Sequence, residues 1–146
     1  MKFTCSVEIN QSIDKVSELF NDTRNLKEWQ DGFISLDHIS GTKGEPGAKS
    51  RIRYKAGRHE IELIETITEK DLPHTFKGTY EAKQMANTMK NRFISLGPDH
   101  TRWEAEIEYI RISSFMMKIM ATLFPGMFRK QTQKWLDQFK AFAEGS

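Results

Sequence analysis

The sequence is short of cysteine and of long apolar runs. Cys5 is the only cysteine among the 146 residues, which excludes an intrachain disulfide and any zinc site built from several cysteines. No segment reaches the roughly 20 apolar residues that span a bilayer. Residues 1–10 alternate in polarity, unlike the apolar core of a signal peptide. We therefore expect a cytoplasmic protein, either a monomer or a homodimer.

An excess of one charge is lacking as well. The 22 basic and 20 acidic residues leave a net charge of +2, which is too small to indicate nucleic-acid binding. A basic series within residues 49–58 has no exposed aromatic ladder beside it, so it is typical of a solvated strand face. The four histidines are scattered, without the spacing of a metal site. We expect no nucleic acid, no metal and no cofactor.

The first part of the chain carries one strand pattern and two helix patterns. Apolar residues alternate with polar ones from Phe3 to Ile9, which predicts a strand. Ser12 can then act as the N-cap of a helix, because its hydroxyl can accept a hydrogen bond from the first turn. A second short helix is expected at 25–29, ended by Gly32. The chain length and its hydrophobic content of 38% predict one globular domain over residues 1–146.

Strand patterns then continue for roughly 75 residues, interrupted by a loop rich in glycine at 41–47. A two-residue turn at 57–58 would pair Lys55 with Glu60 and would leave apolar side chains opposite one another on the other face. One face of the hairpin is then ionic and the other apolar. This pattern predicts an antiparallel sheet with one solvated face.

Two further turns predict which residues lie opposite one another on the inner, apolar face of the expected sheet. A three-residue loop would pair Phe93 with Trp103, and a four-residue loop at 84–87 would pair Tyr80 with Asn91. The three registers agree with one another, as they should in a sequence that specifies one sheet.

Two polar residues, Glu65 and Asn91, fall on this inner face among apolar and aromatic ones. A buried polar group without a partner costs about 1–3 kcal/mol, so each needs a protein partner, water or a ligand. Either an internal hydrogen-bond network or a ligand pocket satisfies that requirement. Because a carboxyl group in an apolar pocket has a raised pKa, Glu65 is also the candidate for acid–base catalysis.

The closing stretch 115–142 contains six aromatic residues and four of the seven methionines, and its apolar spacing predicts a long C-terminal helix. Pro125 and Gly126 should kink this helix or start its main segment. Methionine adapts to irregular spaces, so residues 116–128 fit a pocket wall as well as a packed core. The apolar run 115–128 is too short to span a membrane but suits transient contact with its surface.

The order of these elements resembles the helix-grip superfamily, which includes START domains, Bet v-type allergens and polyketide cyclase/dehydrase-like proteins. The similarity is carried by the strand leading into 12–20, the segment NLKEW at 25–29, the loop at 41–47 and the ending WLDQFK at 135–140. It implies an α+β fold in which a curved antiparallel sheet of about six or seven strands wraps around the C-terminal helix. In such folds the space between sheet and helix binds lipids, sterols, polyketides or hormones.

From the residues and this resemblance we expect a protein that binds or transports a small hydrophobic molecule, such as a lipid, a polyketide or another aromatic or isoprenoid compound. The residues expected to contact it are Tyr54, Glu65, Tyr80, Asn91, Phe93, Trp103, Met120, Phe124, Phe128 and Gln131. An alternative is a cyclase- or dehydratase-like enzyme with Glu65 as its acid or base, which we favour less because perturbed carboxyls are often structural. A third is a protein-interaction module related to chaperone cofactors.

Overall fold

The computed structural model describes residues 1–124 and 126–146. Its seven strands form one antiparallel sheet in the order β1-β7-β6-β5-β4-β3-β2. The strands are β1 Lys2–Ile9, β2 Phe33–Ser40, β3 Lys49–Ala56, β4 His59–Asp71, β5 Thr75–Ala82, β6 Met85–Gly97 and β7 His100–Ile112. Two small helices follow β1 and a long helix closes the chain, so the predicted α+β architecture is confirmed.

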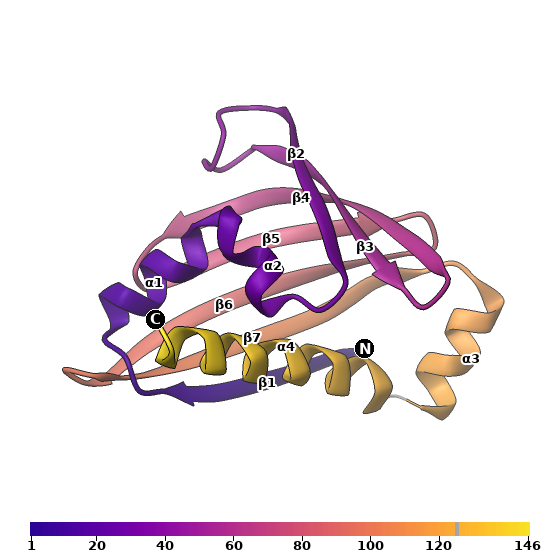
Figure 1. Ribbon diagram of the computed structural model, residues 1–146. Coiled ribbons are helices and arrows are strands. Elements are labelled where there is room, and N and C mark those ends of the chain that lie inside the picture. The colour runs from indigo at the N-terminus through magenta and orange to yellow at the C-terminus, as the bar shows by residue number, and fades with distance from the viewer. Residues whose placement is uncertain (125) are drawn as a thin grey trace.

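Most of the helices lie on one face of this curved sheet, whereas the helix at Phe115–Leu123 stands at one end of the sheet (Figure 1). The helices are α1 Ile13–Asn21, the short 3-10 helix η1 Thr23–Asn25, α2 Leu26–Trp29, α3 Phe115–Leu123 and α4 Gly126–Glu144. The Ser12 hydroxyl accepts a hydrogen bond from the Lys15 N–H at 3.2 Å, as expected of the N-cap of α1. The closing stretch forms two helices, and its main segment starts at Gly126. Pro125 lies outside the described residues.

Two of the three predicted hairpin registers are confirmed. Lys55 lies opposite Glu60 in the β3–β4 pair, and Phe93 lies opposite Trp103 in the β6–β7 pair. On the solvated face the side chains then pair diagonally, with Arg53 bound to Glu60 at 2.7 Å. Such exposed ion pairs add little stability, typically about 0–1 kcal/mol, so the burial of the apolar face contributes more to the choice of register than they do.

The predicted register of β5 against β6 is wrong by four residues. Only two residues separate β5 from β6, where a four-residue loop at 84–87 was expected. Tyr80 therefore lies opposite Asn87, and Asn91 lies opposite Phe76. Because the error is an even number of residues, every side chain stays on its predicted face. The residue opposite each β5 side chain on β6, however, is not the predicted one.

Aromatic side chains fill one end of the inner face, which we call the closed end and define by Phe20, Trp29, Phe93, Trp103 and Phe139. Trp103 and Phe139 are fully buried, and their ring centroids are 5.1 Å apart. Phe20 of α1 meets Phe93 edge to face at the same separation, 5.1 Å. Burying each such side chain contributes about 1.5–3 kcal/mol, so this cluster is the main core of the fold.

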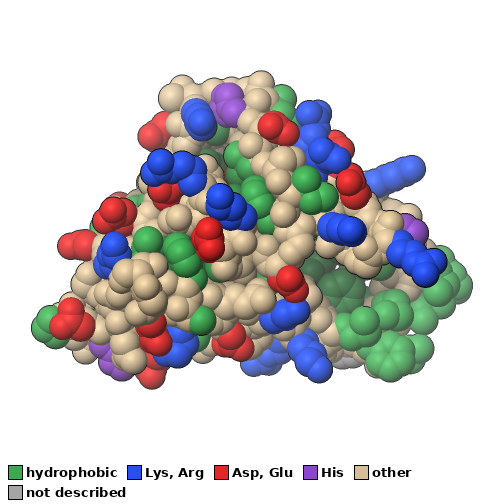
Figure 2. Space-filling model, viewed as in Figure 1, with side chains coloured by type: hydrophobic (Ala, Val, Ile, Leu, Met, Phe, Trp, Pro, Cys, Tyr) green, Lys and Arg blue, Asp and Glu red, His purple; other side chains and the backbone are tan. Residues whose placement is uncertain are grey.

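The other end of the inner face is covered less completely, and we call it the open end. It carries side chains from the middle of the sheet that keep partial solvent exposure, namely Leu63, Glu65, Tyr80, Asn87, Met89 and Tyr109. Helix α4 packs mainly against β1 and α2, while α3 buries none of its residues. Figure 2 shows a hollow at this end, with hydrophobic side chains around it.

Candidate functional site

A row of polar side chains crosses the open end of the sheet. Glu65 on β4 lies opposite Tyr80 on β5, Tyr80 lies opposite Asn87 on β6, and Asn87 lies opposite Tyr109 on β7. Residues that are directly opposite in an antiparallel sheet point to the same face. The polar row therefore runs over four strands on the face that α4 crosses.

Apolar residues flank the polar row on both sides. One neighbouring row contains Ile52, Leu63 and Ala82, and the other contains Ile67, Gly78 and Met89. A ligand placed over this part of the sheet would meet apolar surface with one line of hydrogen-bonding groups. Sites for small molecules commonly combine an apolar lining with a few polar groups in this manner.

Glu65 and Tyr80 form the central contact of the row. The Tyr80 hydroxyl donates a hydrogen bond to Glu65 Oε2 at 2.8 Å. Burial raises the pKa of the Glu65 carboxyl above its ordinary value of 4.5, while the hydrogen bond from Tyr80 lowers it. Burial also raises the pKa of Tyr80, with the charge of Glu65 acting in the same direction. Since Glu65 keeps some solvent exposure, it is recessed rather than sealed.

Gly78 gives the Tyr80 ring the space to reach Glu65. A Cβ atom at Gly78 would lie 3.2 Å from the Tyr80 hydroxyl oxygen and 3.2 Å from the backbone oxygen of Thr66. These separations are tighter than ordinary van der Waals contact, so a side chain at Gly78 would push the tyrosine away. The absence of a side chain at Gly78 therefore helps to hold the Glu65–Tyr80 pair in place.

Tyr54 closes the β3 side of the open end. Its hydroxyl donates to Gln30 Oε1 at 2.8 Å, and its ring packs against Trp135 of α4 with centroids 5.2 Å apart. Burial raises the pKa of Tyr54, and the charge of Glu65 adds to this shift, so the two groups are electrostatic neighbours. The indole N–H of Trp135 is buried without a hydrogen-bond partner among the described residues. It is one unused donor beside this tyrosine.

Helix α4 supplies a second aromatic contact on the opposite side. Phe128 meets Tyr109 edge to face, with ring centroids 5.0 Å apart. Burial raises the pKa of Tyr109 to about 12. The hydroxyls of Tyr80 and Tyr109 therefore stay protonated near neutral pH and can donate hydrogen bonds. The first half of α4 thus bridges the open end at Phe128 and Trp135.

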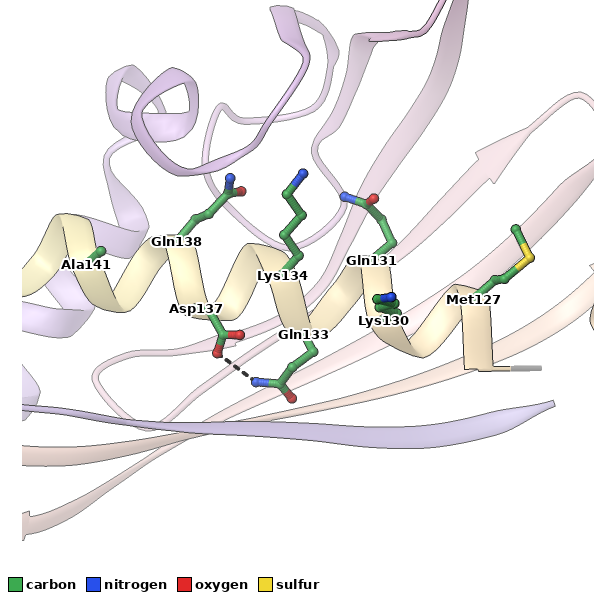
Figure 3. Close-up of a pocket in the computed structure, with 8 residues that line it drawn as sticks. All are labelled: Met127, Lys130, Gln131, Gln133, Lys134, Asp137, Gln138 and Ala141. Atoms are coloured by element: carbon green, nitrogen blue, oxygen red, sulfur yellow. Dashed lines mark hydrogen bonds between the residues drawn. The ribbon is translucent and has the colours of Figure 1, made fainter. Parts of the chain in front are cut away.

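A separate depression of about 700 Å³ runs along α4. Figure 3 shows Gln131, Lys134 and Gln138 pointing to one side of the helix, while Asp137 and Gln133 point to the other. The depression is lined by Met127, Lys130, Gln131, Gln133, Lys134, Asp137, Gln138 and Ala141. It includes no residue of the polar row. Six of its eight lining residues are polar or charged, but the surface that they present to the depression is mostly apolar, formed by their aliphatic stems. We place the candidate site at the open end of the sheet, where recessed polar and apolar groups meet.

The ten sequence-predicted contact residues fall into three places. Glu65, Tyr80, Tyr54 and Phe128 lie around the open end. Phe93 and Trp103 belong to the closed end. Three other predicted contact residues, on α3 and α4, lie further from the polar row. Gln131 lines the depression along α4, Met120 is partly buried on α3, and Phe124, at the C-terminal end of α3, is 54% exposed.

Asn91, the tenth, is buried in the closed end with 1% of its surface exposed. Its Oδ1 accepts a hydrogen bond from the Trp103 indole N–H at 2.9 Å, and its Nδ2 donates to the Phe76 carbonyl oxygen at 3.2 Å. Asn91 is therefore satisfied by an internal hydrogen-bond network, which is the first of the two alternatives considered for the inward polar residues, and not by a ligand pocket. The side chain that lies opposite Tyr80 is that of Asn87, a residue that was expected in the loop at 84–87.

Neither metal ligation nor membrane spanning has a visible basis in the part of the chain that the structure describes. Across residues 1–124 and 126–146, no three His, Cys, Asp or Glu side chains gather as a metal site requires. No helix within the same residues has the length and apolar content to cross a bilayer.

This architecture is the helix-grip fold of START and Bet v1-like proteins. A conserved protein from Geobacillus kaustophilus is similar over 100% of this chain and 97% of its own, with a TM-score of 0.83 and 13% identity. The aromatase/cyclase Zhui from Streptomyces sp. R1128 matches over 99% and 93%, with a TM-score of 0.80 and 9% identity. A START superfamily protein from Mycobacterium smegmatis matches over 94% and 97%, with a TM-score of 0.67 and 13% identity.

At these identities the similarity establishes the fold alone. No protein-family model and no curated protein matches the sequence. Function must therefore be argued from the site, because one fold hosts many activities.

Proposed function

We propose that this protein binds or carries, in the cytoplasm, a small hydrophobic molecule with one polar end. The apolar body would lie against Leu63, Met89 and Phe128, and the polar end would reach Glu65 and Tyr80. The observation that carries this proposal is the polar row at the open end. Recessed polar groups on an apolar face require hydrogen-bonding partners, and a ligand can supply them. The helix-grip fold is itself typical of hydrophobic-ligand binding, which supports the proposal.

The chemistry of Glu65 favours a ligand that carries a hydroxyl group. Oε2 already accepts a hydrogen bond from Tyr80, and Oε1 has no donor among the described residues. An ionised carboxylate only accepts hydrogen bonds, whereas a protonated carboxyl both donates and accepts them. A hydroxyl can also do both, so it matches Glu65 in either state. An aliphatic alcohol or a phenol on an apolar skeleton therefore fits best.

A matched pair of probe ligands tests this assignment. Naphthol and methylnaphthalene have nearly the same shape, and only naphthol carries a hydroxyl. We expect each to displace the fluorescent probe Nile red from the protein, with naphthol binding about tenfold more tightly because it hydrogen-bonds a recessed carboxyl. In Glu65→Leu this preference should disappear, while methylnaphthalene should bind at least as well as before.

Glu81→Leu is the matched control for that experiment. Glu81 lies on β5 next to Tyr80 but is exposed, so its replacement should leave the preference for naphthol unchanged. Native mass spectrometry of protein purified from its own host gives an independent test, because a retained hydrophobic molecule would appear as added mass. The proposal is contradicted if no bound species is found and neither probe displaces Nile red.

An enzymatic role is the second candidate, favoured by the raised pKa of Glu65 beside a tyrosine hydroxyl. A raised pKa moves a carboxyl group towards the range in which it can act as a general acid or base near neutral pH. One structurally similar protein is named an aromatase/cyclase. We expect Glu65→Gln to abolish any cyclisation or dehydration of a polyketone substrate while Nile red binding persists. Equal turnover by the parent and Glu65→Gln would exclude this role for Glu65.

A further inference from the structure

An apolar surface at the tip of the molecule has no role in the site described above. Its side chains lie on α3 and at the start of α4, where Phe115 is 75% exposed, Met116 65% and Leu123 64%. Met127 at the beginning of α4 is 51% exposed. Figure 2 shows these hydrophobic side chains gathered at one end of the molecule. We call this surface, defined by Phe115, Met116, Leu123 and Met127, the apolar tip.

Such a cluster is unusual for a surface that only meets water. Large contiguous apolar patches on soluble proteins mark sites of interaction with proteins, ligands or membranes. The helix that carries most of this one, α3, buries none of its residues. Packing within the fold therefore does not account for its apolar composition.

The chain segment that carries the apolar tip has charges of one sign. From Tyr109 to Leu136 the sequence has no aspartate or glutamate. It does contain five basic residues, Arg111, Lys118, Arg129, Lys130 and Lys134. The remainder of the chain has 17 basic against 20 acidic residues. The excess of positive charge is thus confined to the segment that carries the apolar tip.

Three of these cations are free to meet an external partner. Lys118, Arg129 and Lys130 are exposed, and none of them pairs with a carboxylate among the described residues. Lys134 differs, because it binds Asp31 at 2.7 Å. An exposed apolar helix bordered by cations is the composition of segments that lie in the headgroup region of a bilayer.

A second copy of the chain fits this surface poorly. In a symmetric dimer the same patch meets itself, so Lys118, Arg129 and Lys130 of both copies would be gathered at one interface. Like charges at close range repel, and no acidic residue in the segment compensates for them. An anionic lipid surface instead offers both an apolar interior and negative headgroups.

We propose that the apolar tip docks onto anionic phospholipid bilayers, with Phe115, Met116 and Leu123 inserted among the headgroups and Lys118 and Lys130 bound to lipid phosphates. The tip stands beside the hollow at the open end. Docking would therefore bring that hollow to the bilayer surface, from which a hydrophobic molecule can enter. The docking itself does not depend on the proposed function, since it needs no ligand in the site.

Flotation with vesicles tests the proposal on the full chain. The vesicles are phosphatidylcholine alone, or equal parts of phosphatidylcholine and phosphatidylglycerol. We expect binding to the anionic vesicles that weakens as salt is added. The double variant Lys118→Gln/Lys130→Gln should weaken it about fivefold for each lysine lost. The double variant Phe115→Ser/Leu123→Ser should weaken it about tenfold or more, because both side chains insert.

Matched control variants lie elsewhere on the surface. Lys27→Gln/Lys43→Gln removes the same charge at exposed positions of α2 and the 41–47 loop. Ile39→Ser/Leu96→Ser removes two apolar side chains that are 45% and 42% exposed on other strands. Neither control should change vesicle binding. All four variants alter exposed positions, where substitutions cost little stability, and circular dichroism checks that each remains folded.

Four results would overturn the docking proposal: no binding to anionic vesicles, equal binding to neutral ones, an equal loss in the control variants, or a dimer that Phe115→Ser/Leu123→Ser converts to monomer in sedimentation velocity. The last result would assign the tip to a second copy of the chain. Glu65→Leu separates this inference from the proposed function. It should lose the preference for naphthol and float with anionic vesicles like the parent.

Discussion

The closed and open ends of the inner face differ in how completely a recessed polar side chain is hydrogen-bonded and buried. At the closed end Asn91 is 1% exposed, and both its oxygen and its nitrogen are bound within the protein. At the open end Glu65 has one protein hydrogen bond, from Tyr80, and keeps solvent contact. A polar group that is fully satisfied fixes a core. One that is recessed but only partly satisfied remains available to a ligand.

The helices explain why the two ends differ. Phe20 of α1, Trp29 of α2 and Phe139 of α4 converge on Trp103 at the closed end. Only the first half of α4 crosses the open end, where Phe128 and Trp135 touch Tyr109 and Tyr54. One end is thus packed from three helices and the other is bridged by one. Substitutions placed in matched pairs along this axis should separate stability from binding.

The largest contrast is expected between two phenylalanines of the same helix. Phe139→Ala should lower the free energy of unfolding by about 3–5 kcal/mol, because it removes a fully buried ring from a close-packed cluster. Phe128→Ala should cost about 1 kcal/mol or less, since that side chain is partly exposed, and should instead weaken Nile red binding. Urea denaturation and fluorescence titration measure the two effects. Equal losses of stability would show that the open end is as tightly packed as the closed one.

The next contrast compares two asparagines of β6. Asn91→Leu should cost about 1–3 kcal/mol, because the buried Trp103 indole N–H loses its acceptor. Asn87→Leu, four residues away on the same face, should change stability by about 0.5 kcal/mol or less. The wavelength of tryptophan emission should shift in Asn91→Leu alone. A larger loss in Asn87→Leu would mean that the polar row, and not the aromatic cluster, holds the sheet together.

The sequence predicted the fold well because its strongest signals are local. Polarity alternation gave the faces of the strands, and Ser12 marked the start of α1. The β5–β6 turn had no such signal. Lys83 and Gln84 are not typical of a tight turn, whereas Asn87 is, so the loop was placed too late and Tyr80 was paired with Asn91. A strand register that is predicted from turn residues will be wrong where the turn consists of residues with no preference for turns.

The candidate site was predicted only in part, for the same reason. Glu65 and Tyr80 were both placed on the inner face, but the contact between them depends on the register of β5 with β4. Asn87 was missed because it was assigned to a loop. Whether an inward polar residue is sealed or open depends on which helix covers it, and that is set by packing across the chain rather than by local pattern. Asn91 and Glu65 occupy equivalent positions in the polarity pattern, as polar residues on the apolar face, but the helices bury Asn91 and leave Glu65 partly exposed.

The smallest contrast concerns the response of the two faces of the sheet to pH. Burial raises the pKa of Glu65 above 4.5 in the folded protein. Between 4.5 and the raised pKa, the folded state holds a proton that the unfolded state has lost. The free energy of unfolding therefore falls as the pH rises through this window. In Glu65→Gln no proton can be lost, so the variant should gain stability relative to the parent as pH increases and then level off.

Urea denaturation of both proteins at a series of pH values measures this difference. Glu81→Gln makes the same chemical change on an exposed side chain of β5, and it controls for the change in net charge. A relative gain confined to Glu65→Gln would sharpen the distinction between the recessed and the solvated face. If the difference between Glu65→Gln and the parent stayed constant with pH, or fell as pH rose, Glu65 would not be a desolvated carboxyl. The open end would then lack the polar group on which ligand recognition depends.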